Sequence, residues 1–203
     1  MKTDIKMWEF HDFVDGENGC IYGIPSNANR VLQCNVKEKS VKEIGPYLGK
    51  EINKYKYGIK ANNGVIYCMP YRAKYILKIT TREGQDAEVS ILKEKQLPGD
   101  NKNKWIEGAL SKDGCIYYLP YHSTGHILKL DPNNGDSLSL VGEEIGKYSD
   151  TLVLGKEGYV YCIASHWIIK FNPEDHSIFS RRWKHLLLKS ARTSLKNGFV
   201  NTH

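Results

Sequence analysis

One motif recurs four times along the chain, and this repetition constrains the fold more than any other feature of the sequence. The motif is a turn residue and a glycine, followed by an apolar run whose third residue is tyrosine. Its copies occupy residues 18–25, 63–70, 113–120 and 157–164, and only the last lacks a final proline. The glycines follow one another at steps of 45, 50 and 44 residues. A period in this range indicates a solenoid or a propeller.

Three further short apolar runs accompany each copy of the motif. One run precedes the glycine, and two follow the motif, separated by turn sequences such as the Asp-Pro-Asn-Asn-Gly of residues 131–135. The runs are rich in Ile, Val, Leu and Tyr and are bounded by Gly, Pro, Asn and Asp, which is typical of β-strands. The Asn-Gly or Asp-Gly pair in three copies of the motif favours a tight hairpin.

Each repeat is therefore predicted to form a four-stranded antiparallel sheet. A single sheet of this size cannot bury both of its faces, whereas several sheets packed face to face can. The sequence predicts an all-β propeller with four such blades at residues 8–47, 55–97, 105–145 and 149–180. Three arrangements remain open at this point: a closed four-blade ring, an open arc, and half of an eight-blade ring formed by a homodimer.

The repeat pattern, DG-x-IY-x-x-P followed by ILK-x-DP-x-x-G, resembles the β-propeller repeats of the kelch, YVTN and quinoprotein-like kinds. It is most similar to uncharacterised repeat propellers of algae and other protists, which residues 44–49 (IGPYLG) and 104–108 (KWIEG) also match. The resemblance covers residues 8–180. It implies a propeller architecture and no particular activity, because such folds host many functions.

Charge is concentrated at the C-terminal end of the chain. The net charge is +6, yet no acidic residue follows Asp175, and residues 1–175 are balanced. We therefore expect no specific nucleic-acid binding by the body. Residues 181–203 are interpreted as a basic tail with an amphipathic helix at 183–197, which either covers the last blade or docks to an acidic partner or an anionic membrane surface. The expected contact residues of the tail are Arg181, Arg182, Lys184, Lys189, Arg192 and Lys196.

The cysteines and the N-terminal segment suggest where the protein resides. The chain has five cysteines and no CxxC pair, so neither a complete set of intramolecular disulfides nor a zinc site of that type is expected. The N-terminal residues contain acids and lack an apolar core of the signal-peptide type. We interpret the cysteines as small, buried and reduced, and we expect a cytoplasmic protein without a transmembrane segment.

Candidate chemical groups were weighed against simpler structural roles. The repeated tyrosines Tyr22, Tyr67, Tyr117 and Tyr161 are interpreted as packing between blades. His122, His126 and His166 lie in predicted loops and are retained as loop contacts without metal-ligand spacing. The gluconolactonase-like kind of propeller binds calcium through polar side chains near its channel, and this resemblance draws attention to Asn18, Asn63, Asp113 and Glu157, which turn formation already explains.

The leading hypothesis is a non-enzymatic interaction scaffold whose propeller loops bind a protein or peptide partner. The alternative is a metal-dependent hydrolase of the lactonase type at the central channel, and a third reading is carbohydrate or small-ligand binding. The sequence contains no recognisable catalytic motif. No catalytic residue, metal ligand or cofactor is therefore assigned.

Overall fold

A computed structural model describes residues 9–94, 97, 105–120, 125–145, 152–164 and 167–182. In this part of the chain sixteen strands form four sheets of four strands. Blade 1 contains β1 (Phe10–Asp15), β2 (Cys20–Pro25), β3 (Val31–Asn35) and β4 (Ser40–Ile44). Blade 2 contains β5 (Tyr55–Lys60), β6 (Val65–Pro70), β7 (Ile76–Thr80) and β8 (Glu88–Leu92).

Blades 3 and 4 repeat the same plan. Blade 3 contains β9 (Trp105–Leu110), β10 (Ile116–Pro120), β11 (Ile127–Asp131) and β12 (Ser137–Val141). Blade 4 contains β13 (Leu152–Leu154), β14 (Val160–Ala164), β15 (Trp167–Phe171) and β16 (Ile178–Arg182). In every sheet each strand pairs antiparallel with the next strand along the chain. The predicted all-β architecture of four antiparallel blades is confirmed.

The repeated glycine closes the first hairpin of every blade. Gly19, Gly64, Gly114 and Gly158 all have a positive φ, between 74° and 93°. A residue with a side chain is strained in this region of backbone conformation, whereas glycine adopts it freely. The anchor glycine of the repeat therefore has a local cause, the turn between the first and second strands.

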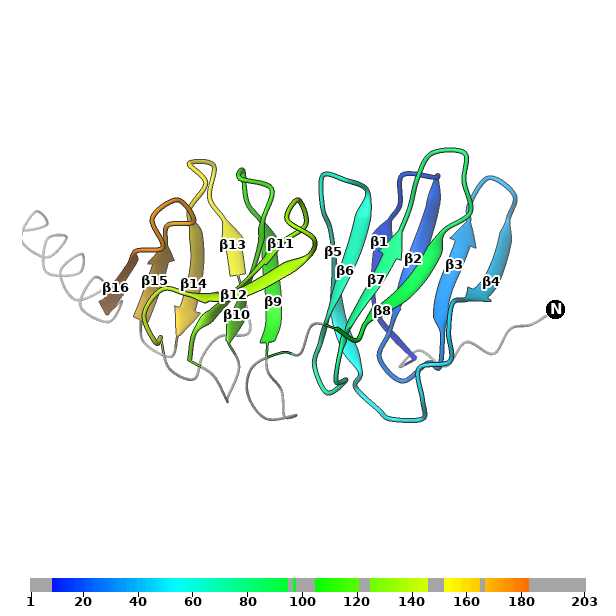
Figure 1. Ribbon diagram of the computed structural model, residues 1–203, viewed down its shortest axis with the longest axis horizontal. Coiled ribbons are helices and arrows are strands. Elements are labelled where there is room, and N and C mark those ends of the chain that lie inside the picture. Colours follow the sequence, from blue (N-terminus) through cyan, green and yellow to red (C-terminus); the bar gives the residue numbers. More distant parts are fainter. Residues whose placement is uncertain are drawn as a thin grey trace, which may run out of the picture.

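The four blades form an open row. Figure 1 places the sheets of blades 1 and 4 at opposite ends of the molecule. The first and third hairpins of the blades lie along one edge, and the connections between blades lie along the other edge with the second hairpins. The first strands of consecutive blades contact one another, β1 with β5, β5 with β9 and β9 with β13. The described residues thus form an open row rather than a closed four-blade ring, and such a row is compatible with both the open arc and half of an eight-blade ring.

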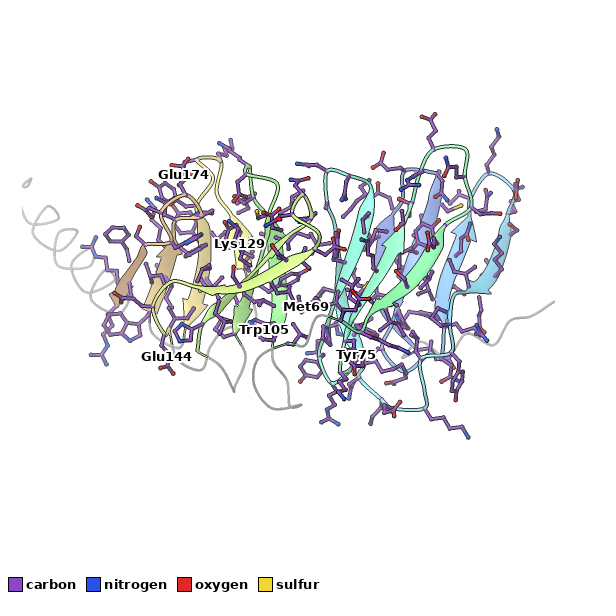
Figure 2. The ribbon with its side chains drawn as sticks, viewed as in Figure 1. Met69, Tyr75, Trp105, Lys129, Glu144 and Glu174 are labelled. Atoms are coloured by element: carbon purple, nitrogen blue, oxygen red, sulfur yellow. The ribbon has the colours of Figure 1, made fainter. Side chains whose placement is uncertain are left out.

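The core lies between neighbouring blades in three apolar clusters. Tyr22 and Val31 of blade 1 pack with Ile66 of blade 2, and the other two junctions repeat this arrangement. Figure 2 labels Met69 and Trp105, both buried in the cluster between blades 2 and 3. Because burial of apolar surface is the main favourable term in folding, each inner blade is held chiefly by its two neighbours.

The boundary between blade 4 and the tail differs from the expected one. Arg181 and Arg182 belong to β16, where they pair with Ile168 and Trp167. Both are exposed, and the outer strand of a sheet accepts charged side chains because backbone hydrogen bonds hold it. β16 thus continues two residues past the expected boundary at residue 180. The helix expected at 183–197 lies outside the described residues, and among those described no helix has the length and apolarity to cross a membrane.

Candidate functional site

Three of the four repeated tyrosines, Tyr22, Tyr67 and Tyr117, lie between blades as predicted, whereas Tyr161 is half-buried on blade 4 with no described blade against it; each of the four forms a hydrogen bond. Tyr22, Tyr67 and Tyr117 are almost completely buried against the following blade. The Tyr22 hydroxyl donates to Asn18 at 2.9 Å and the Tyr117 hydroxyl to Asp113 at 2.8 Å. Burial raises the pKa of Tyr22 to about 12, so the hydroxyl remains a donor at neutral pH. These tyrosines are structural and do not form a ring around a ligand.

The junction between blades 2 and 3 has the strongest polar contact of this series. The Tyr67 hydroxyl donates to Asp136 Oδ1 at 2.5 Å, and Lys78 Nζ donates to Asp136 Oδ2 at 2.5 Å. Tyr67 and Lys78 come from blade 2, whereas Asp136 comes from the β11–β12 hairpin of blade 3. The ammonium of Lys78 also lies 5.6 Å from the centre of the Tyr67 ring. A lysine in this repeat position thus fills the space between two blades.

Blade 1 has Gln33 where the later blades have Lys78, Lys129 and Lys170, and a polar groove opens at this junction. The groove has a volume of about 620 Å³ and lies between the β3–β4 hairpin of blade 1 and the β7–β8 hairpin of blade 2. The β7–β8 hairpin is the longest of its kind, with residues 81–87 between the strands. The groove is lined by Asn18, Cys20, Gln33, Asn35, Glu38, Ser40, Lys42, Gly84, Gln85 and Asp86.

Both walls of the groove carry groups that donate and accept hydrogen bonds. The Asn18 amide donates to the Gln85 carbonyl at 3.1 Å and ties the two walls together. Lys42 of blade 1 lies 3.7 Å from Asp86 of blade 2, and both side chains are well exposed. The lining has no aromatic side chain. Its chemistry is that of amides with two carboxylates, Glu38 and Asp86, and one ammonium, Lys42.

Two carboxylates occupy one repeat position on the first strands of blades 1 and 3, near the axis of the arc. Asp12 accepts a hydrogen bond from the Gly58 backbone N–H at 3.1 Å, and Glu107 accepts one from the Leu152 N–H at 2.9 Å. Burial raises the pKa of Glu107, and the Leu152 N–H acts in the opposite direction. Both carboxylates join a blade to the following one, which is a structural use of the position.

The polar turn residues that the lactonase hypothesis invoked are each engaged locally. Asn63 accepts a hydrogen bond from the Val65 N–H at 3.1 Å, and Glu157 accepts one from the Tyr161 hydroxyl at 2.5 Å. Asn18 and Asp113 bind Tyr22 and Tyr117 in the same manner. Within the described ranges, no three His, Cys, Asp or Glu side chains are grouped so that they could hold a metal ion.

The other predicted site residues fall in different places. His126 is half-buried, and its Nδ1 lies 3.3 Å from the Gly142 carbonyl, a contact that fastens the loop after β12. His122, His166, Lys184, Lys189, Arg192 and Lys196 lie outside the described residues. Of the predicted loop histidines and basic residues, the structure describes His126 in blade 3 and Arg181 and Arg182 on β16 of blade 4.

All five cysteines are free thiols, and four of them are buried. Burial raises the pKa of Cys115 to about 11 and of Cys162 to about 12. A thiol reacts as its thiolate, so these side chains are poor nucleophiles at neutral pH. The interpretation of the cysteines as small buried groups holds for all but Cys34, which is partly exposed.

The groove was missed by sequence reasoning because its walls come from residues about 50 positions apart. Two signals were nevertheless present in the sequence. Gln33 departs from the repeated lysine, and the β7–β8 hairpin is longer than its equivalents. A comparison of the repeats position by position would have marked the junction between blades 1 and 2 as the one that differs.

No family model matches the chain, and no curated protein matches its sequence. The fold does match solved structures. Virginiamycin B lyase from Staphylococcus aureus has 12% sequence identity and a TM-score of 0.66, over 89% of this chain and 57% of that one. A streptogramin B lyase has 14% identity and a TM-score of 0.63, over 89% and 56% of the two chains.

A further match is the periplasmic gluconolactonase of Pseudomonas aeruginosa, with 10% identity and a TM-score of 0.59 over 85% and 53% of the two chains. The chain thus spans little more than half the length of the solved propellers it matches. At such low identity the likeness concerns architecture alone. The comparisons, together with the four antiparallel sheets, show that this chain consists of β-propeller blades.

Proposed function

We propose that this chain is a non-enzymatic interaction scaffold that binds an extended peptide segment of a partner protein. The groove between blades 1 and 2 is the single observation that carries the proposal. Its volume of about 620 Å³ lies within the range of ligand-binding clefts. It opens on the edge of the blades that carries their first and third hairpins, including β3–β4 and β7–β8 (Figure 1).

The chemistry of the lining favours a peptide over other ligands. An extended peptide presents one N–H donor and one C=O acceptor per residue. The side-chain amide of Gln85 offers both kinds of partner. Gln33 and Asn35 are partly engaged, because Gln33 Nε2 donates to Cys20 Sγ at 3.2 Å and Asn35 Oδ1 accepts the Glu38 N–H at 3.0 Å, so each would contribute its other amide atom. Sugars are usually held against aromatic rings, and the groove lining has none. Lys42 and Asp86 at the mouth would select a segment that carries charges of both signs.

The proposal is tested by selecting ligands from a random-peptide display library on the full-length chain. A selected peptide should bind with a Kd that rises about tenfold in Asp86→Lys, the loss of one charged contact. The matched control is Asp175→Lys, which changes another exposed hairpin aspartate in blade 4, and it should leave the Kd unchanged. Binding that Asp86→Lys does not weaken would contradict the proposal.

An enzymatic assay provides the complementary test. The purified chain would be incubated with gluconolactone in the presence of calcium, zinc or a chelator. A hydrolysis rate equal to that of the buffer agrees with a scaffold. Metal-dependent turnover that is lost in a variant of the channel carboxylate Glu107 would replace the scaffold with the hydrolase hypothesis. Kinship with kelch, YVTN or quinoprotein-like repeats remains part of the proposal and fits either outcome.

A further inference from the structure

Blade 4 presents the face that every other blade uses to hold its successor. Val31, Ile76 and Ile127 occupy one repeat position, are completely buried, and pack against the following blade. Ile168 occupies that position in blade 4 and is 37% exposed. On the same face Val153 and Phe179 are also exposed. A blade-binding surface thus stands uncovered by the described residues at one end of the row.

Blade 1 presents the opposite face, which every other blade uses to hold its predecessor. Ile66, Ile116 and Val160 occupy one repeat position, are at most 1% exposed, and pack against the preceding blade. Ile21 has that position in blade 1 and is 36% exposed. Val41 on the same face is 51% exposed.

An aromatic ring completes this face of blade 1. In blade 3, Tyr118 stands opposite Gly108 across the sheet, and its ring is buried against blade 2. In blade 1 the pair is reversed, so that Phe13 stands opposite Gly23 and its ring covers the same area of the sheet. Phe13 is 55% exposed. On the same face Leu32 is already buried with Phe10 and Ala28, so the exposed apolar part of the face consists of Ile21, Val41 and Phe13.

The charges on the two exposed faces are complementary when placed in the register of the existing junctions. At the junction of blades 1 and 2, Glu17 lies 3.1 Å from Lys60. The same two repeat positions hold Lys156 on blade 4 and Asp15 on blade 1, and both side chains are exposed. Asp15 already pairs with Lys60 of blade 2 at 2.7 Å, so a junction of blade 4 with blade 1 would bring a second ammonium to this carboxylate.

A second pair follows from the Tyr67–Asp136 contact. One position in the third hairpin of the blades, directly before a serine, has a positive φ near 55° in three of them; it is occupied by Lys39, Asp136 and His176. Asp136 there faces the tyrosine of the preceding blade. In a junction of blade 4 with blade 1, Lys39 would face Tyr161 and its hydrogen-bonded partner Glu157. Lys170 on the same face is turned onto its own Tyr159 ring, 3.6 Å from the ring centre.

We propose that two copies of this chain form one closed ring of eight blades, in which blade 4 of each copy packs against blade 1 of the other. The two junctions are equivalent by a two-fold axis, and no blade face stays exposed. The exposed face of blade 4 is the one that holds a following blade, and the exposed face of blade 1 is the one that holds a preceding blade. A second copy of this chain carries both faces and therefore fits both. The ring leaves the groove between blades 1 and 2 free, and the proposal is independent of peptide binding.

The test is the mass of the full chain in solution, measured by light scattering over a range of micromolar concentrations. We expect twice the chain mass of 23.2 kDa. Ile21→Glu and Ile168→Glu each place a carboxylate in one face, and each variant alone should run as a monomer because both of its junctions are damaged. An equimolar mixture of the two variants retains one undamaged junction, and it should recover the dimer.

The control is Ile52→Glu, since Ile52 is 57% exposed in the segment between blades 1 and 2 and lies on neither face. It should remain dimeric, and thermal melts should show that all three variants are folded. A wild-type chain that stays monomeric over the whole range of micromolar concentrations overturns the proposal. The two faces are then covered by another segment of this chain or by another protein. A dimer disrupted only by Ile21→Glu, a mixture that stays monomeric, or open-ended polymers overturn it as well.

Discussion

Asp136 illustrates how a single side chain joins two blades. Its carboxylate receives the Tyr67 hydroxyl and the Lys78 ammonium, and the residue is 8% exposed. Its backbone has a φ of 56°, a conformation that Asn and Asp tolerate better than other residues with side chains. The position therefore requires both an acceptor and a residue suited to left-handed backbone.

Substitution at Asp136 separates these two requirements. Asn tolerates the left-handed backbone as Asp does, and its side-chain oxygen can still accept one hydrogen bond. Asp136→Asn loses only the ion pair with Lys78, so we expect the free energy of unfolding to fall by about 1 kcal/mol. Asp136→Ala leaves Tyr67 and Lys78 without a partner and adds backbone strain, so we expect about 3 kcal/mol. Urea denaturation measures both. Equal losses for the two variants would show that the hydrogen bonds contribute little.

Glu107 should make stability depend on pH. Burial raises the pKa of the Glu107 carboxyl above its ordinary value of 4.5 in the folded protein. The stability that the protonated carboxyl contributes is therefore fully present below the ordinary pKa, and it is lost as the pH rises through the raised pKa. Glu107→Gln keeps an acceptor for the Leu152 N–H and does not titrate. Its stability relative to wild type should therefore increase between pH 4 and pH 7 in denaturation experiments.

A second variant at the same residue serves as the control. Glu107→Ala removes the acceptor, leaves the Leu152 N–H unpaired, and should cost about 1–2 kcal/mol at pH 7. If Glu107→Gln gains nothing between pH 4 and pH 7, the carboxylate is not disfavoured by its surroundings. The structural role of the inner-strand position would then rest on the Asp12–Gly58 bond alone.

Single strands were the level at which the sequence was most informative. The alternation of apolar residues and the turn residues predicted the strands of all four blades, because in a propeller each strand is specified by its own hairpins and by one repeated contact. The groove was not predicted, because it depends on the difference between two repeats and on the length of the β7–β8 hairpin. β16 includes Arg181 and Arg182, which the composition assigned to the tail, because backbone pairing does not depend on side-chain charge.

The end of β16 leads to a prediction for truncated chains. A chain that ends at Arg182 keeps both pairs of that strand end, Arg181 with Ile168 and Arg182 with Trp167. It should melt within about 2 °C of the full chain. A chain that ends at Ser180 loses these backbone hydrogen bonds, each worth about 1 kcal/mol, and its midpoint should fall by several degrees. A large drop already on ending at Arg182 would show that residues 183–203 stabilise the body.

At the scale of the whole molecule, stability should be a sum over junctions between neighbouring blades. The three apolar clusters each involve two consecutive blades, and the contacts between first strands follow the same order. The sequence could predict this stacking because each repeat has the same faces. It could not predict whether the row closes, because closure depends on the angle between blades, which the repeat pattern does not encode.

Removal of blade 4 tests this additive view. A chain that ends at Ile145 exposes one face of blade 3 and leaves the clusters between blades 1 and 2 and between blades 2 and 3 intact. We expect it to unfold cooperatively, with an m-value reduced by about a quarter because that share of the buried surface is gone.

Hydrogen exchange measured on the same shortened chain locates the effect. Backbone amides of β6 and β7 should stay protected, whereas those of β10 and β11 should exchange faster, because stability in a repeat array depends on nearest neighbours. Loss of protection throughout the shortened chain would mean that the four blades fold as one indivisible unit. In that case the closed ring of two copies, rather than any single junction, would be the folded species on which all the other predictions depend.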